Sequence, residues 1–393
     1  MEELEDAAKA PPLPDAFLRF LEANGLDPSI YTAIDSTPRY IRLKPGFEAC
    51  LEGIEAEVNC KLEKLEWLSG FYSLPPHIQI ARSRAYREGK IYGIDAASGA
   101  AVMALDISPG DHVLDLCAAP GAKLCMMLDL LGDSGSVTGV DVARHRLAAC
   151  RTMLQKYMLG DRCRLFVADG TAFSVVPSRF CSDRESCESG LEERGDLFKE
   201  WTSRRPWKER KRANKSGTVL VSRFQPPELI YYGQYSGVVG ITKGELYKTL
   251  SDSEIANHGY DKVLVDAECT HDGSVKHIQK FEHWGWRTLQ HRVLDAERTD
   301  DLHTLQLNLL SNGFRLLKVG GSLIYSTCSL TVAQNEDVVE QFLKENRTAE
   351  LTEIDAARNW PCKGGRMPKT WRFDPSTSQT SGLFIAKFTK LGI

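Results

Sequence analysis

The chain has 393 residues, enough for one large domain with accessory parts or for two or three domains. A hydrophobic fraction of 42% and a charged fraction of 26% are typical of a soluble globular protein. The net charge of −4 excludes a global basic field, so RNA or DNA binding would need local basic patches.

The N-terminal residues 1–12 are acidic and lack an apolar core, which argues against a secretory signal and an Arg-rich transit peptide. We expect a disordered tail there, and an intracellular protein of the nucleus or cytoplasm that is not secreted. No apolar stretch reaches membrane-spanning length, so no membrane contact is expected. The chain is taken as a monomer.

Eleven cysteines without a signal peptide fit a reducing compartment, in which they remain thiols. They include no Cys-x-x-Cys pair, so no metal site is expected. Five of the nine histidines fall between His271 and His303, without metal-type spacing. The favoured interpretation of these histidines is a surface or RNA-facing cluster.

Residues 13–85 predict a small N-terminal α/β subdomain, which we expect to bind RNA. Asp15 lies near the start of its first helix and Gly25 follows the end of that helix. The expected elements are a helix over 14–25, a strand over 40–43, a helix over 47–58 and a short strand over 65–68.

Residues 86–393 alternate helical and strand patterns. Asp95 is expected to cap a small-residue helix over 96–105. The later strands are apolar on both sides of the alternation, as in parallel strands that helices cover on both faces. The pattern therefore predicts an α/β, Rossmann-like domain with a mostly parallel sheet. Strands are expected over 112–114, 136–140, 164–168, 262–265 and 322–326, and helices over 124–131, 144–159, 299–317 and 335–345.

Residues 178–217 interrupt this alternation, because they are rich in Ser, Arg, Lys and Glu. A connection of this length without periodicity is functional or disordered. Its second half is basic and contains Trp201 and Trp207, and such residues contact phosphates and stack on unpaired bases. RNA contact and a disordered, solvated basic loop are equally supported, with a nuclear-import signal as a third interpretation.

Beyond this insert, further elements complete the predicted sheet. A strand is expected over 219–221 and a helix over 246–258. A last strand over 383–388 should add an antiparallel edge to the sheet, with Trp360 and Trp371 packed nearby.

A strand, a turn of small residues and a helix follow one another at residues 111–123. The strand ends in Asp115, the turn runs from Cys117 to Gly121, and Lys123 opens the helical pattern. A turn of this kind in an open α/β sheet receives an adenosine-type cofactor at the helix N-terminus. It is not a P-loop, whose Lys is followed by Ser or Thr where this chain has Leu124. An ordinary strand-to-helix turn is the alternative.

A polar residue or cluster follows nearly every predicted strand, and the carboxyl ends of parallel strands line one crevice. We therefore expect these residues to converge. Two of the clusters contain a cysteine. A single buried cysteine is usually a small hydrophobe, but two at the mouth of one crevice indicate catalysis. The clusters are Asp115, Asp141, Asp169 with Gly170, Asp266 to Cys269, and Thr327 to Ser329.

Three sequence runs resemble the NOL1/NOP2/Sun (RsmB/NOP) family of S-adenosylmethionine-dependent RNA cytosine-C5 methyltransferases. They are Leu114 to Lys123 (LDLCAAPGAK), Tyr325 to Thr331 (YSTCSLT) and Gln334-Asn335-Glu336. The resemblance extends from Tyr40 to Lys390. It implies a class I methyltransferase fold, S-adenosyl-L-methionine as cofactor and RNA as partner, with tRNA favoured over rRNA or mRNA because many family members act on it.

The resemblance also implies roles for individual residues. Cys328 would add as a thiolate to C6 of cytosine and so activate C5, while Cys269 would assist product release. Asp266 would contact the target base or the methyl-donor region. The expected cofactor residues are Cys117, Ala118, Ala119, Pro120, Gly121, Ala122 and Lys123 around the methionine end, Asp141 at the ribose with Arg146 in support, Asp169 at the adenine, and Asp266. An exposed helix residue is the alternative for Arg146.

Two positions depart from the family pattern. Ala122 replaces a second Gly and asks only for ordinary backbone angles, so cofactor binding should survive. Glu268 replaces Pro before Cys269, where a carboxylate would disfavour the thiolate by like-charge repulsion. We hypothesise that Glu268 contacts N3 or the exocyclic amine of cytosine; a solvent-facing side chain paired with Lys276 is the alternative.

Two rival functions remain, the first of them suggested by Glu268 and the long insert and opposed by the retention of Cys269 and Cys328. The first is a catalytically impaired family member that binds RNA or S-adenosylmethionine. The second is a methyltransferase acting on protein or a small molecule, which is weaker because that class has no use for paired cysteines.

Overall fold

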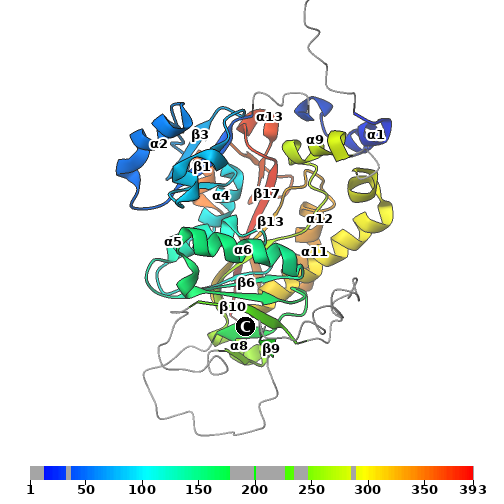
Figure 1. The fold of residues 1–393 in the computed structure, drawn as a ribbon. Helices are drawn as coiled ribbons and strands as arrows, with labels where there is room; N and C mark the ends of the chain where they lie inside the picture. Colours follow the sequence, from blue (N-terminus) through cyan, green and yellow to red (C-terminus); the bar gives the residue numbers. More distant parts are fainter. Residues whose placement is uncertain are drawn as a thin grey trace, which may run out of the picture.

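A computed structural model describes residues 13–31, 37–177, 199–200, 226–233, 247–284 and 289–392. The expected tail over 1–12, the strand over 219–221 and nearly all of the insert over 178–217 lie outside these residues. The described chain forms a central sheet with helices on both faces and a smaller sheet beside it (Figure 1).

The five strands predicted for the domain core are confirmed as the parallel centre of the large sheet. Parallel strands joined through helices make this a Rossmann-like fold. The strands lie side by side in the order β13 (Leu317–Thr327), β12 (Tyr260–Asp266), β5 (His112–Asp115), β6 (Ser136–Asp141) and β7 (Cys163–Val167).

Further strands flank this parallel centre. β17 (Leu383–Lys390) pairs antiparallel with β13, and its other side is covered by β16 (Thr370–Phe373) and β14 (Ala349–Thr352), with β15 (Lys363–Gly364) beyond β16. The prediction that the last strand forms an edge is therefore wrong, although Trp360 and Trp371 do pack into the neighbouring core. Beyond β7 lie β10 (Glu228–Tyr232), antiparallel to it, and β9 (Lys199–Glu200).

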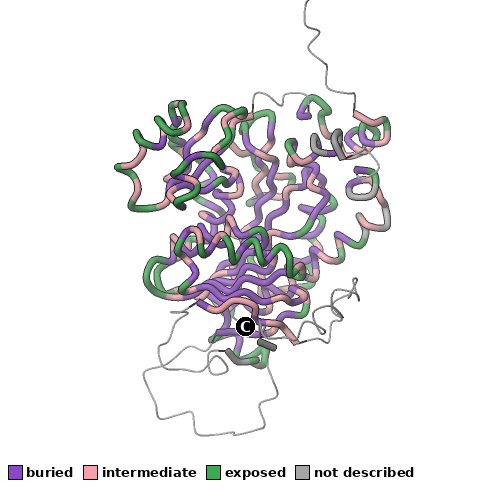
Figure 2. The backbone as a smooth tube through the Cα atoms, viewed as in Figure 1, coloured by how far each residue is buried: buried purple, intermediate pink, exposed green. Residues whose placement is uncertain are grey.

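Helices cover both faces of the sheet and form two separate cores. Neighbouring strand residues divide between them: Val113 packs into one core and Leu114 into the other, each with 0% exposure. This two-sided burial explains the continuous apolar pattern of the strands, and Figure 2 shows it as buried chain through the centre of the molecule. The first core is covered by α4 (Ala96–Met103), α5 (Ala122–Leu131) and α6 (Arg144–Tyr157), and the second by α8 (Asp252–His258), α11 (Ala296–Leu316) and α12 (Glu336–Glu345).

Side chains at the N-termini of α4 and α8 determine where these two helices begin. Asp95 caps α4 as expected, because its carboxylate accepts a hydrogen bond from Ala97 N at 3.0 Å. The helix expected over 246–258 is confirmed only from Asp252 onward as α8, since β11 (Tyr247–Thr249) pairs with β8 (Val175–Pro177) before it begins. A capping box between Ser251 and Glu254 starts that helix, which separates it from the strand.

The smaller sheet is antiparallel and is built near the N-terminus. Its order is β2 (Glu63–Lys64), β3 (Phe71–Leu74), β1 (Arg39–Leu43) and β4 (Ile91–Gly93), with α2 (Leu51–Val58) and α3 (Arg84–Arg87) beside it. The strand expected over 65–68 is wrong. These residues form the turn between β2 and β3, and Leu65 and Leu68 reach the core from it.

The N-terminal unit differs from the predicted span of 13–85. Its strand β4 lies beyond residue 85, and α1 (Asp15–Ala23) packs elsewhere. Phe17 and Leu21 of α1 lie with Ile278 and Phe281 of α9 (Val275–Trp284), across the molecule from the small sheet (Figure 1).

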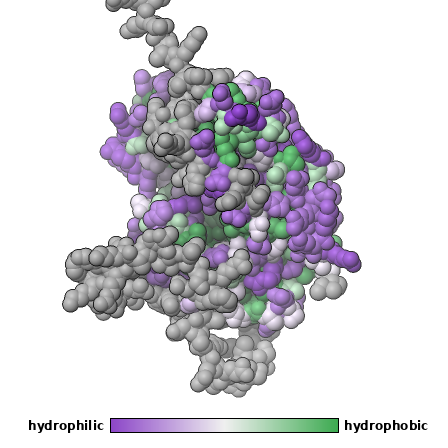
Figure 3. Space-filling model, turned by 90° about the vertical axis from the view of Figure 1, so that its right-hand side faces the viewer, coloured by the Kyte–Doolittle hydropathy of each residue, from purple (hydrophilic) through white to green (hydrophobic). Residues whose placement is uncertain are grey.

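Short helical segments complete the described chain. They are η1 (Pro28–Tyr31), η3 (Glu48–Cys50), η4 (Ile80–Arg82), η5 (Gly160–Arg162), the π-helix η6 (Gln290–Leu294), η7 (Asp355–Asn359) and α13 (Pro375–Ser378). In the part of the chain that the structure describes, no helix is both long and apolar enough to cross a membrane. On the face that carries α1 and α11, Figure 3 shows a mostly hydrophilic surface that includes smaller apolar areas.

Candidate active site

The acidic residues predicted to converge stand at one edge of the sheet. Asp115, Asp141 and Asp266 are the last residues of β5, β6 and β12, and Asp169 follows β7. Because these strands are parallel and adjacent, their carboxyl ends meet at that edge. The predicted crevice residues are thus brought together by the sheet itself.

The turn of small residues after β5 is held tightly against α6. Gly121 has a φ of 108°, and a Cβ there would lie 3.1 Å from Cα of Cys150, so a side chain would be strained and would crowd α6. Ala118 N donates to Val140 O at 3.0 Å, which fastens the turn to β6. Ala122 is the first residue of α5 and has an ordinary helical backbone, as expected for the change from glycine.

Asp141 organises the second side of this turn. Its carboxylate is 4% exposed and accepts hydrogen bonds from Ala119 N at 3.2 Å and Ala143 N at 2.8 Å. Arg146 donates to Ala119 O at 2.8 Å, and its guanidinium lies 3.8 Å from Asp141. Arg146 therefore supports the turn, and a carboxylate with two bonds made still has lone pairs for a ligand.

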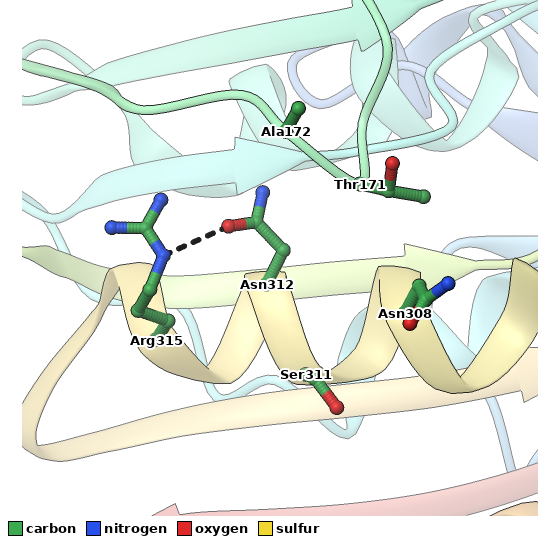
Figure 4. Close-up of a pocket in the computed structure, with 6 residues that line it drawn as sticks. All are labelled: Thr171, Ala172, Asn308, Ser311, Asn312 and Arg315. Carbon is green, nitrogen blue, oxygen red and sulfur yellow. Dashed lines mark hydrogen bonds between the residues drawn. The ribbon is translucent and has the colours of Figure 1, made fainter. Parts of the chain in front are cut away.

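Asp169 lies in the turn after β7, which α11 holds in place. Its Oδ1 accepts from Thr171 N at 2.9 Å and from Thr171 Oγ1 at 2.7 Å. Asn312 donates to Gly170 O at 2.7 Å, and Arg315 donates to Asn312 at 3.0 Å. These α11 residues, which the sequence analysis missed, line a cavity of about 380 Å³ beside the turn, with Thr171, Ala172, Asn308 and Ser311 (Figure 4).

Lys123 and two acids carry the charge at the centre of the crevice. Lys123 Nζ lies 2.7 Å from Asp266 Oδ2, and Ser326 Oγ donates to the other Asp266 oxygen at 2.7 Å. Burial opposes the charge of Lys123, but the Asp266 carboxylate outweighs it, so the pKa of Lys123 is raised. Asp115 is 1% exposed, and burial together with neighbouring Asp266 raises its pKa to about 7.

The two predicted cysteines lie side by side. Cys269 follows β12 and Cys328 follows β13, and the parallel pairing of these strands brings their sulfur atoms to 3.2 Å. Cys269 is 1% exposed and Cys328 is half-buried. Cys328 is therefore the more accessible of the two thiols.

His271 completes this cluster and was not among the predicted site residues. Its Nδ1 lies 2.9 Å from Cys328 Sγ and 3.8 Å from Cys269 Sγ. The prediction of a surface position is wrong for this histidine, because it packs half-buried against the cysteines. A signal was present in the sequence, since His271 stands only two residues after a candidate catalytic cysteine at a strand end.

The three side chains together favour one negative sulfur. Burial opposes a thiolate at Cys269, but a hydrogen bond from Cys328 and the charge of His271 hold the pKa of Cys269 well below its ordinary value. The same hydrogen bond and burial raise the pKa of Cys328 well above its ordinary value. The pKa of His271 is raised, chiefly by the Cys269 thiolate. The three groups therefore share two protons: His271 is an imidazolium, Cys328 is a thiol and Cys269 is a thiolate.

A buried polar network fixes the loops that carry these cysteines. Gln334 accepts from Thr270 N at 3.1 Å and donates to Thr331 Oγ1 at 3.1 Å. Asn335 donates to Ser329 O at 2.8 Å. The Gln334-Asn335 pair therefore ties the loop after β12 to the loop after β13, which explains why these residues accompany the cysteines.

Glu268 turns away from the thiols. Its carboxylate, with the side chain 50% exposed, lies 2.8 Å from Arg298 of α11. Lys276 instead donates to Pro38 O at 3.3 Å, so the expected alternative pairing with Lys276 is wrong. The expected repulsion does not decide the state of Cys269, because the hydrogen bond from Cys328 and the charge of His271 lower its pKa, and Glu268 is paired with Arg298.

Comparison with known proteins identifies relatives of the chain. Residues 102–185 and 240–389 match the family model described as 16S rRNA methyltransferase RsmB/F. The chain is 22% identical over 345 residues to tRNA (cytosine(49)-C(5))-methyltransferase of Pyrococcus abyssi, covering 85% of this chain and 82% of that protein. It is 24% identical over 306 residues to ribosomal RNA small subunit methyltransferase B of Pseudomonas syringae pv. tomato, covering 78% of this chain and 48% of the relative.

The chain thus spans about half the length of the Pseudomonas relative.

Solved structures share the fold. The structure titled NSun6 from Pyrococcus horikoshii with SFG has a TM-score of 0.64 at 15% identity, with 97% of this chain and 99% of that chain covered. A methyltransferase homologue from Pyrococcus horikoshii has a TM-score of 0.57 at 20% identity, with 96% and 100% covered.

Proposed function

The chain belongs to the 16S rRNA methyltransferase RsmB/F family, and from that premise we propose that it methylates C5 of cytosine in RNA with S-adenosyl-L-methionine as methyl donor. One observation carries the proposal: Cys269 and Cys328 place their sulfur atoms 3.2 Å apart at the crevice. Paired thiols suit a reaction in which one sulfur adds to the base and a second group assists its release.

The residues present fit the methyl donor. The donor supplies a methyl group on a positively charged sulfur when it is bound. Asp115 and Asp266 give the crevice acidic groups, and a bound cation would favour the ionised form of Asp115, whose pKa burial raises to about 7. The turn from Cys117 to Lys123 would hold the methionine end, since its small side chains let a ligand approach the backbone closely.

Other expected cofactor contacts remain part of the proposal. Asp141 would accept hydrogen bonds from the ribose hydroxyls, with its position fixed by two backbone N–H groups. Arg146 would act indirectly, because its hydrogen bond goes to Ala119 O of the turn. Asp169 would face the adenine from a turn that α11 holds.

In the proposed reaction, Cys328 is the nucleophile and Cys269 acts at product release. Cys328 is the accessible sulfur, whereas Cys269 is 1% exposed. Addition of sulfur to C6 makes C5 electron-rich enough to accept the methyl group. Asp266 is fixed by Lys123 and Ser326 between the cofactor turn and the cysteines, so it would position the target base or the donor.

The finer substrate assignment is tRNA ahead of rRNA or mRNA. The relative that this chain matches over 82% of its length is the one named as a tRNA methyltransferase. The target cytosine must leave its stack to reach Cys328, so loop or single-stranded cytosines are expected. The N-terminal subdomain and the insert over 178–217 would hold the flanking RNA. A nuclear or cytoplasmic location is consistent with the nine described cysteines, which are all free thiols.

A catalytically impaired family member is the second candidate, which Glu268 and the insert over 178–217 suggested. That support is reduced because Glu268 pairs with Arg298 and leaves the Cys269 thiolate favoured.

The test uses purified protein, labelled S-adenosyl-L-methionine and separate tRNA and rRNA pools. Wild type should label one pool, Cys328→Ala should abolish labelling, and Cys269→Ala should accumulate a protein–RNA adduct that survives denaturing electrophoresis. Donor binding without labelling of any RNA would support the impaired candidate. Loss of labelling in Cys269→Ala with retention in Cys328→Ala would reverse the roles of the two sulfurs.

A further inference from the structure

We propose that His271 is a catalytic residue, the shared counter-ion of the two cysteines: its imidazolium holds the thiolate on Cys328 for attack and then on Cys269 for removal of the C5 proton. This inference rests on the proposed function. It gives a role to His271, which was not among the predicted site residues.

The geometry places His271 against both sulfurs. Its Nδ1 is 2.9 Å from Cys328 Sγ and 3.8 Å from Cys269 Sγ, while the sulfurs are 3.2 Å apart. A thiolate on Cys328 would accept hydrogen bonds from the imidazolium and from the Cys269 thiol together. An ion pair of this kind is how nucleophilic cysteines are activated at neutral pH.

The chain holds His271 in this place at some backbone cost. His271 has a φ of 59°, in the left-handed region that residues other than glycine seldom occupy. The next residues lock it: Asp272 accepts from Leu330 N at 2.7 Å, and Gly273 N donates to Cys328 O at 2.9 Å. The loop is therefore fastened to the same segment that carries the nucleophile.

The same three side chains are less well arranged for a metal ion. Their ligand atoms lie within 4.8 Å of one another. Tetrahedral zinc would separate two ligand sulfurs by about 3.8 Å and a sulfur from a nitrogen by about 3.5 Å. The observed separations of 3.2 Å and 2.9 Å are shorter and suit hydrogen bonds.

The charges around His271 favour its protonated form. The groups that face it are the two cysteines, the carboxylates of Glu268 and Asp266, and the His277 ring of α9 at 5.2 Å between centroids. The Cys269 thiolate raises the pKa of His271 most, burial opposes this, and the two carboxylates add to the increase.

The proton balance closes over one turnover. At rest His271 is an imidazolium, Cys269 is the thiolate and Cys328 keeps its proton. Transfer of the Cys328 proton to Cys269, across the 3.2 Å between the sulfurs, leaves Cys328 as the thiolate beside the imidazolium for attack. The sulfur electron pair forms the S–C6 bond, and the C5=C6 pair is available for the new C5–methyl bond. Bonded Cys328 no longer carries charge, so the imidazolium then favours loss of the Cys269 proton to water.

The resulting Cys269 thiolate takes the C5 proton. The C5–H pair restores C5=C6, and the S–C6 pair returns to Cys328 as a thiolate beside the same imidazolium. One proton leaves to water for each methyl group transferred, as the overall reaction requires.

The test measures the thiols without RNA or methyl donor. Alkylation by iodoacetamide is followed from pH 5 to 9, with mass spectrometry to locate the label on Cys328 or Cys269. An ordinary thiol of pKa about 8.5 is about 3% thiolate at pH 7, so His271→Asn should slow alkylation at pH 7 by about tenfold or more. The matched control, His277→Asn, should keep the wild-type rate and pH profile.

Several results would overturn the inference: a wild-type profile in His271→Asn, equal losses in both histidine variants, or faster wild-type alkylation after a chelator. With RNA and donor present, His271→Asn should slow adduct formation in the Cys269→Ala background. If the thiol result holds while no RNA is methylated, the inference stands and the proposed function fails. If methylation proceeds at full rate in His271→Asn, the inference fails and the proposed function stands.

Discussion

Replacing Asp115 by Asn should stabilise the protein at neutral pH. Asp115 is 1% exposed, and burial first, with the nearby Asp266 charge second, raises its pKa to about 7. In an unfolded chain an aspartate has a pKa of about 3.9, so raising it to about 7 in the folded protein corresponds to about 4 kcal/mol. Asn keeps an acceptor for the hydrogen bond from Cys117 N, at 3.2 Å from Asp115 Oδ1.

The raised pKa of Asp115 determines how the free energy of unfolding changes with pH. Because the folded pKa is raised, the fold favours protonated Asp115. Its favourable contribution is full below about pH 3.9 and is lost as the pH rises toward about 7. Urea unfolding at pH 5 and pH 8 should therefore show Asp115→Asn gaining stability relative to wild type, with about 3 kcal/mol more gain at pH 8 than at pH 5.

Asp133→Asn is the matched control, since Asp133 is an exposed acid just beyond α5. It should leave the pH dependence of unfolding unchanged. A stability difference between Asp115→Asn and wild type that does not grow between pH 5 and pH 8 would refute the reasoning. Donor binding, measured by calorimetry, should weaken in Asp115→Asn, because a neutral amide does not attract a cation.

Three further changes test other parts of the site. Gln334→Leu leaves Thr270 N–H buried without its 3.1 Å acceptor and should cost about 2 kcal/mol or more in urea unfolding, whereas Gln341→Leu on the surface of α12 should cost little. Gly121→Ala forces a side chain to a φ of 108° and should lower both stability, by at least about 1 kcal/mol, and donor affinity by calorimetry. Glu268→Pro should change turnover or cytosine choice in the labelled-donor assay; unchanged values for both would dispose of the base-contact hypothesis.

The sequence by itself determined the framework of the site. Continuous apolar strands such as the one containing Val113 and Leu114 indicated a parallel sheet with both faces covered, and both residues are fully buried. Once the strands are parallel, chain order alone places Asp115, Asp141 and Asp266 at one edge. Local pattern sufficed here because the fold class fixes where strand ends lie.

Tertiary structure decided which side chains meet within that framework. Whether β17 forms an edge depends on β14 and β16, which pair with its outer side. Glu268 pairs with Arg298 on α11, and Cys328 and His271 rather than Glu268 set the direction of the Cys269 pKa.

The position of His271 also could not be predicted from local sequence. Its position depends on a left-handed backbone and on a loop fastened to the segment of Cys328, far along the chain. Periodicity and spacing report local backbone preference, whereas ion pairs, strand neighbours and side-chain direction depend on contacts between distant segments, and these form only when the chain has packed.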